Sequence, residues 1–133
     1  MSLYAAEVRS TQVERYIKTC KDELWISSLT QVEFYSAVNI KKRMKALSLA
    51  QAKHIIQLFE QHIAQRHFIL VHLTHEVYDL AKTILYASKV ALRSLDALHL
   101  ACAKQHHLEL ITADKMLHLA ANKCDVQSVL LEQ

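Results

Sequence analysis

The chain has 133 residues, of which 52% are hydrophobic, and its 16 basic and 13 acidic residues give a net charge of +3. This length suits one compact domain with a core, and no apolar run reaches the length of a membrane-spanning helix. No apolar leader follows Met1, and the cysteines Cys20, Cys102 and Cys124 form no CxxC pair. We therefore expect a cytoplasmic protein without a disulfide framework, whose mildly basic charge permits a nucleic-acid partner.

Hydrophobic periodicity predicts helices that alternate with short strands. In chain order, we expect a helix over 3–19, a strand over 24–27, a helix over 30–43, a helix over 49–66 capped by Ser48, a strand over 68–73, a helix over 75–89 capped by Thr74, a helix over 95–105 capped by Ser94, a strand over 108–112, a helix over 114–122 and a strand over 126–131. This alternation is typical of an α/β fold with a parallel sheet covered on both faces. Because no linker or repeat is present, we expect a single domain over 1–133.

Glycine and proline are both absent from the chain, although average usage would give roughly 9 glycines and 6 or 7 prolines. Helices must therefore end with other residues in the left-handed region. Asparagine and histidine tolerate positive φ better than most residues. The expected positions are Asn39, His106, His107 and Asn122.

Three acidic residues lie where expected helices begin. Glu33 is in the first turn after the strand over 24–27, and Asp114 follows the strand that ends at Thr112. Asp96 begins a helix of about 11 residues, or roughly 16 Å, and the chain returns through a strand of about 5 residues, again roughly 16 Å. Because these lengths match, we expect all three acids at the carboxyl edge of the sheet, where open α/β sheets bind ligands.

Each acidic residue also has a purely structural interpretation. Thr30 and Glu33 fit a capping box, in which the glutamate returns a hydrogen bond to the cap. Asp96 suits the positive end of a helix dipole, and Asp114 can cap a helix through its carboxylate. Glu76 occupies a comparable position and is interpreted as a dipole residue alone. Position by itself therefore does not distinguish a metal ligand from a capping residue.

Local sequence motifs do distinguish these alternatives. The segment 93–103, RSLDALHLACA, resembles the Asp-Ala-Leu-His-Leu-Ala-x-Ala stretch of PIN-domain nucleases. The segment 109–115, ELITADK, is similar to the strand of that family that ends in Thr-x-Asp. The segment 27–37, SSLTQVEFYSA, is similar to the Ser-x-x-x-x-Glu start of a family helix. Order and spacing agree over essentially the whole chain.

The resemblance implies an α/β/α sandwich and a metal-dependent endoribonuclease, commonly the VapC-type toxin of a toxin–antitoxin pair that is held by a protein antitoxin. Glu33, Asp96 and Asp114 would then be the catalytic carboxylates that bind Mg²⁺ or Mn²⁺, because hard oxygen ligands suit these ions. The metal would activate a water molecule for hydrolysis of an RNA phosphodiester. The candidate substrate contacts next to the acids are Arg93, Thr112 and Lys115.

One part of the family pattern has no counterpart. The family begins with a strand of the type apolar-Asp-Thr/Ser-Ser, whose aspartate is the first metal ligand, whereas Leu3 and Tyr4 resemble the start of the helix that follows it. We therefore expect the central N-terminal strand to be missing. Backbone groups of two neighbouring strands would then lose their hydrogen-bond partners, and each buried group left unpaired costs about 1–3 kcal/mol. The expected remedies are direct pairing of the strands over 24–27 and 108–112, or a homodimer.

Three hypotheses follow. The first is a PIN-type ribonuclease, with activity in doubt because one ligand and one strand are absent. The second is a non-catalytic remnant of that fold, which acts as a binding or dimerisation module. The third is a purely helical protein in which the strands have been misassigned.

Overall fold

The computed structural model describes residues 2–4 and 24–131, and these residues form a parallel sheet with helices packed around it. The strands are β1 (Ser2–Tyr4), β2 (Leu24–Ser27), β3 (Ile69–Val71), β4 (Glu109–Thr112) and β5 (Ser128–Leu130). They form a five-stranded sheet in the order β3-β2-β1-β4-β5, and every neighbouring pair is parallel. The α/β class with a parallel sheet is confirmed, and the purely helical hypothesis is wrong.

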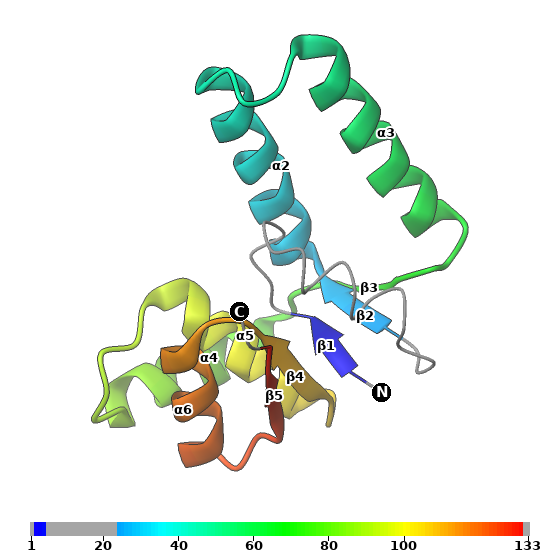
Figure 1. Cartoon of the computed structure of the whole chain (residues 1–133). Helices are drawn as coiled ribbons and strands as arrows, with labels where there is room; N and C mark the ends of the chain where they lie inside the picture. The colour runs from blue at the N-terminus through cyan, green and yellow to red at the C-terminus, as the bar shows by residue number, and fades with distance from the viewer. Residues whose placement is uncertain (1, 5–23, 132–133) are drawn as a thin grey trace.

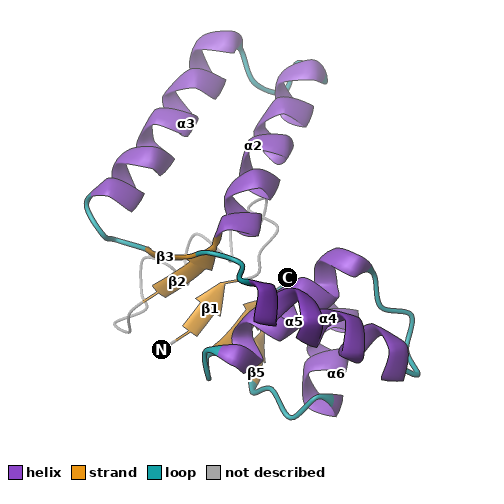
Figure 2. Cartoon of the chain, turned by 180° about the vertical axis from the view of Figure 1, so that it is seen from behind, coloured by secondary structure: helices purple, strands orange, loops and turns teal. Residues whose placement is uncertain are grey.

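The described helices fall into two groups. They are α2 (Ser28–Arg43), α3 (Leu49–Ala64), α4 (His75–Ala87), α5 (Ser94–Gln105) and α6 (Lys115–Lys123). Figure 1 shows α2 and α3 side by side as a hairpin that extends beyond the sheet, and Figure 2 shows α4, α5 and α6 gathered together. None of the described helices combines the length and apolar character needed to cross a membrane.

The core has a part on each face of the sheet, because side chains along a strand alternate between faces. Leu110 packs with Leu100 of α5 and Leu117 of α6, whereas its neighbour Ile111 packs with Leu24 and Ile26 in a second cluster. The first cluster also holds the predicted core residue Cys102, and burial raises the pKa of its thiol to about 11.

The predicted loss of the central strand is wrong. Leu3 and Tyr4 lie in β1, where Leu3 pairs with Trp25 of β2 on one side and with Leu110 of β4 on the other. An empty position there would leave the backbone groups of β2 and β4 unpaired, so tertiary pairing overrides the local helical pattern. The predicted direct pairing of β2 with β4 is therefore also wrong, and a homodimer is not needed to close the sheet. The rest of the helix predicted over 3–19 lies outside the described residues.

Helix boundaries differ slightly from the prediction because capping residues differ. The helix expected from Thr30 begins at Ser28, since the Ser27 hydroxyl accepts a hydrogen bond from the Thr30 amide at 3.1 Å. The N-cap of α5 is Arg93 rather than Ser94. Thr74 and Ser48 cap α4 and α3 as predicted.

Among the described residues, non-glycine residues in the left-handed region end four helices. Each follows the C-cap directly, and the residue after it donates its amide back to the last turn, as Ala46 does to the Lys41 carbonyl at 2.9 Å. This is the Schellman arrangement, which usually employs glycine. Of the predicted positions only His107 is confirmed. The residues concerned are Lys45 (φ 62°), Arg66 (φ 60°), His107 (φ 53°) and Asp125 (φ 59°).

Candidate metal centre

The predicted acidic residues lie on helices that start beyond the carboxyl ends of the strands. Helix α2, which carries Glu33 in its second turn, begins directly after β2. Asp114 is the N-cap of α6, just after β4 ends at Thr112. Asp96 is in the first turn of α5, which leads back to the start of β4. All three backbone positions are therefore at the carboxyl edge, as the element lengths predict.

Glu33 does not form the predicted capping box with Thr30, because Ser27 is the cap of α2. Its Oε1 instead lies 2.7 Å from Nε2 of His99 in α5. The His99 side chain is 5% exposed and that of Glu33 is 33% exposed. This hydrogen bond joins α2 to α5 one helical turn from Asp96.

Asp96 contacts the residue that caps its own helix. Its Oδ2 accepts hydrogen bonds from the backbone N of Arg93 at 3.4 Å and from Nε of Arg93 at 3.3 Å. The Asp96 side chain is 13% exposed, whereas the Arg93 side chain is 76% exposed. Asp96 therefore supports the start of α5, as its structural interpretation predicts, and it also holds a guanidinium at the surface.

Asp114 caps α6 through one carboxylate oxygen. Oδ1 accepts hydrogen bonds from the amides of Met116 at 2.9 Å and Leu117 at 3.4 Å. The amide of Asp114 donates to Oγ1 of Thr112 at 3.0 Å, which holds the turn between β4 and α6. The predicted N-cap is confirmed, and neither capping bond uses Oδ2.

The candidate substrate contacts differ in accessibility. Arg93 and Lys115 are exposed beside Asp96 and Asp114 in the sequence, and their role as substrate contacts stays a prediction. Thr112 is 2% exposed and its hydroxyl has a partner within the turn. This burial does not favour contact between Thr112 and a substrate.

The donor chemistry fits Mg²⁺ or Mn²⁺, since both ions prefer carboxylate oxygens. Within residues 2–4 and 24–131, however, no three His, Cys, Asp or Glu side chains are grouped closely enough to hold a metal ion. Strand β1 carries no acidic residue. Glu33, Asp96 and Asp114 are therefore placed on one edge without forming a ready-made cage, and their role as ligands stays a prediction.

His99 is the functional candidate that sequence reasoning missed. It lies within the DALHLA segment, and its spacing of three residues from Asp96 places both side chains on one face of α5. This spacing is the sequence signal from which His99 could have been predicted to lie near Asp96. The partner Glu33 is 66 residues away along the chain, so only the fold brings the pair together.

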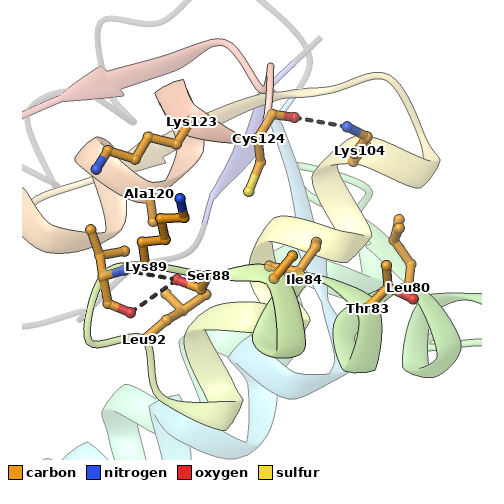
Figure 3. Close-up of a pocket in the computed structure, with 12 residues that line it drawn as sticks. Leu80, Thr83, Ile84, Ser88, Lys89, Leu92, Lys104, Ala120, Lys123 and Cys124 are labelled. Atoms are coloured by element: carbon orange, nitrogen blue, oxygen red, sulfur yellow. Dashed lines mark hydrogen bonds between the residues drawn. The ribbon is translucent and has the colours of Figure 1, made fainter.

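A pocket of about 380 Å³ lies between α4, α5 and α6. Figure 3 shows lysines around its apolar lining, and Nζ of Lys104 donates a hydrogen bond to the Cys124 carbonyl at 2.8 Å. Its walls come from the C-terminal halves of α4, α5 and α6 and from the segment that joins α4 to α5, including Leu92 just before the start of α5. Neither Asp96 nor Asp114 lines this pocket.

Comparison with known proteins gives consistent matches. A family model described as the PIN domain matches residues 1–123. The structure of FitAcB from Neisseria gonorrhoeae is similar with a TM-score of 0.67 and 19% identity, covering 96% of each chain. FitAB bound to an IR36 DNA fragment gives a TM-score of 0.68 and 19% identity, covering 98% of this chain and 94% of that chain. A toxin–antitoxin complex from Klebsiella pneumoniae gives a TM-score of 0.61 and 15% identity, covering 89% of this chain and 90% of that chain. The search of curated proteins found no match.

Proposed function

Because the chain belongs to the PIN-domain family, we propose that it is a metal-dependent endoribonuclease and the toxin of a toxin–antitoxin pair. The observation that carries the proposal is the common location of Glu33, Asp96 and Asp114 at the carboxyl edge of the sheet. These three residues are the proposed ligands of Mg²⁺ or Mn²⁺. The neighbouring basic residues are the proposed contacts to RNA.

The chemistry of the proposed reaction follows from the residues at this edge. A bound divalent ion supplies Lewis acidity to the phosphodiester and to the attacking water. Oδ2 of Asp114 is not used by the cap and is oriented by the turn that Thr112 stabilises. Arg93, which donates a hydrogen bond from Nε to Asp96, presents a positive charge to a phosphate oxygen, and Lys115 presents a second.

The proposed partners are an RNA substrate, a protein antitoxin and a second copy of this chain, in the cytoplasm. The structural neighbours include a toxin–antitoxin complex, which supports an antitoxin. The second candidate function is a non-catalytic binding or dimerisation module. It is favoured by the lack of an acidic residue in β1 and of a ready-made three-ligand group among the described residues.

The proposal is tested by incubating the purified chain with single-stranded RNA and either Mg²⁺, Mn²⁺ or EDTA. We expect cleavage with either ion and none with EDTA, because charge on the phosphate must be neutralised during hydrolysis. RNA that stays intact at millimolar Mn²⁺ with folded protein would contradict nuclease activity and support the binding module.

A further inference from the structure

A buried histidine links the two helices that carry Glu33 and Asp96. His99 Nε2 lies 2.7 Å from Glu33 Oε1, near the short end of N–H···O hydrogen bonds. The imidazole is almost completely buried, whereas the Glu33 carboxylate is one-third exposed at the surface. The histidine therefore contacts the carboxylate from the protein side and leaves its solvent side open.

The surroundings of His99 specify which nitrogen carries the hydrogen. Nδ1 is buried and has no hydrogen-bond partner among the described residues. A buried N–H without an acceptor costs about 1–3 kcal/mol, and an unpaired acceptor is better tolerated. We therefore place the hydrogen on Nε2, which donates it to Oε1 of Glu33. Nδ1 is then an unpaired acceptor, and no buried donor of this ring is left without a partner.

The register of α5 relates this contact to the proposed metal ligands. His99 follows Asp96 by three residues, so the two side chains lie one turn apart on one face. Glu33 is in the second turn of α2, and because Ser27 caps this helix, no capping bond to Thr30 orients the Glu33 side chain. A glutamate has three side-chain torsions, and one short hydrogen bond from a buried ring restricts them.

We propose that His99 is a positioning residue, whose Nε2–H holds the Glu33 carboxylate toward Asp96 at the carboxyl edge. The inference rests on the proposed metal-binding function, since it assigns His99 a role in orienting one of the ligands. Outer groups that orient metal ligands typically change metal affinity by about 10- to 100-fold when they are removed. The prediction is that metal binding, as well as RNA cleavage, depends on this hydrogen bond.

The test measures Mn²⁺ affinity by calorimetry for the full chain and two variants of His99. H99L removes the hydrogen bond and keeps an apolar side chain in the buried position, and we expect its affinity to fall about 10-fold. H99Q retains a donor at nearly the position of Nε2, and we expect its affinity to stay within about threefold of the unchanged chain. Circular dichroism verifies that each variant is folded.

A matched control lies on the same helix. His106 is the C-cap of α5, and its Nε2 is also buried without a partner, but it lies at the end of the helix away from Asp96. H106L should therefore leave Mn²⁺ affinity unchanged. A long-range ¹H–¹⁵N spectrum of the metal-free chain should show the hydrogen of His99 on Nε2.

The outcomes separate this inference from the proposed function. If the unchanged chain binds no Mn²⁺, the metal site and the role of His99 both fail. If the unchanged chain and H99L bind Mn²⁺ equally, or if H99Q is as weak as H99L, only the positioning role fails. A hydrogen on Nδ1 in the spectrum would also overturn it, and this measurement remains decisive if H99L does not fold.

Discussion

Replacing Asp114 by asparagine is expected to reduce RNA cleavage by at least about 100-fold, roughly 2.7 kcal/mol of transition-state stabilisation. The substitution separates two roles that the geometry assigns to one side chain. Asparagine caps helices about as well as aspartate, so the bonds from the Met116 and Leu117 amides to Oδ1 can persist. The negative charge needed by a divalent ion is lost. Initial cleavage rates and urea unfolding of D114N test both parts.

The free energy of unfolding of D114N should differ from that of the unchanged chain by less than about 0.5 kcal/mol. Glu76 supplies a control, because it is a first-turn acid of α4. A hydrogen bond from its own backbone amide, and after it one from the side-chain hydroxyl of Thr74, lower its carboxyl pKa. E76Q should leave cleavage unchanged. Full activity in D114N would mean that Asp114 acts only as a helix cap.

Replacing Leu3 by proline is expected to destabilise the fold strongly, because β1 is hydrogen-bonded on both sides. Proline removes a backbone donor and is excluded from central strands. The carbonyl that loses its partner costs about 1–3 kcal/mol, a large share of a typical total of roughly 5–15 kcal/mol. Urea unfolding of L3P measures the loss.

The control for L3P is L3A, which shortens the same side chain and keeps the amide. The difference between the two variants therefore reports the backbone hydrogen bond together with the fixed φ of proline. We expect L3P to be less stable than L3A by at least about 1 kcal/mol. Equal stabilities of L3P and L3A would contradict the central position of β1 and would support the prediction that the central strand is missing.

Segments with a strong local signal could be predicted from the sequence. The apolar runs at β2 and β4 and the caps Ser48 and Thr74 appear where their patterns place them. Strand β1 could not be found this way, because its three residues have no periodicity of their own and are strands through pairing with β2 and β4. The left-handed residues Lys45 and Arg66 were missed for a related reason. Their φ values follow from how the preceding helices end.

The same distinction between local pattern and tertiary contact applies to the candidate site. The backbone positions of Asp96 and Asp114 follow from short-range chain geometry, so matching the lengths of a helix and a strand was sufficient. The partner of Glu33 depends on how α2 packs relative to α5, and the sequence contains no short-range signal for the bond to His99. Nor could the sequence show whether three side chains at one edge point toward a common centre.

Paramagnetic broadening by Mn²⁺ tests most directly whether Glu33, Asp96 and Asp114 share one ion. Substoichiometric Mn²⁺ is added to the ¹⁵N-labelled chain, and the backbone amide signals are followed by NMR. The signals of residues around all three carboxylates should broaden together, while those around Lys104 and Lys123, at the far ends of α5 and α6, stay sharp. Broadening around one carboxylate alone, or away from this edge of the sheet, would contradict a shared metal site.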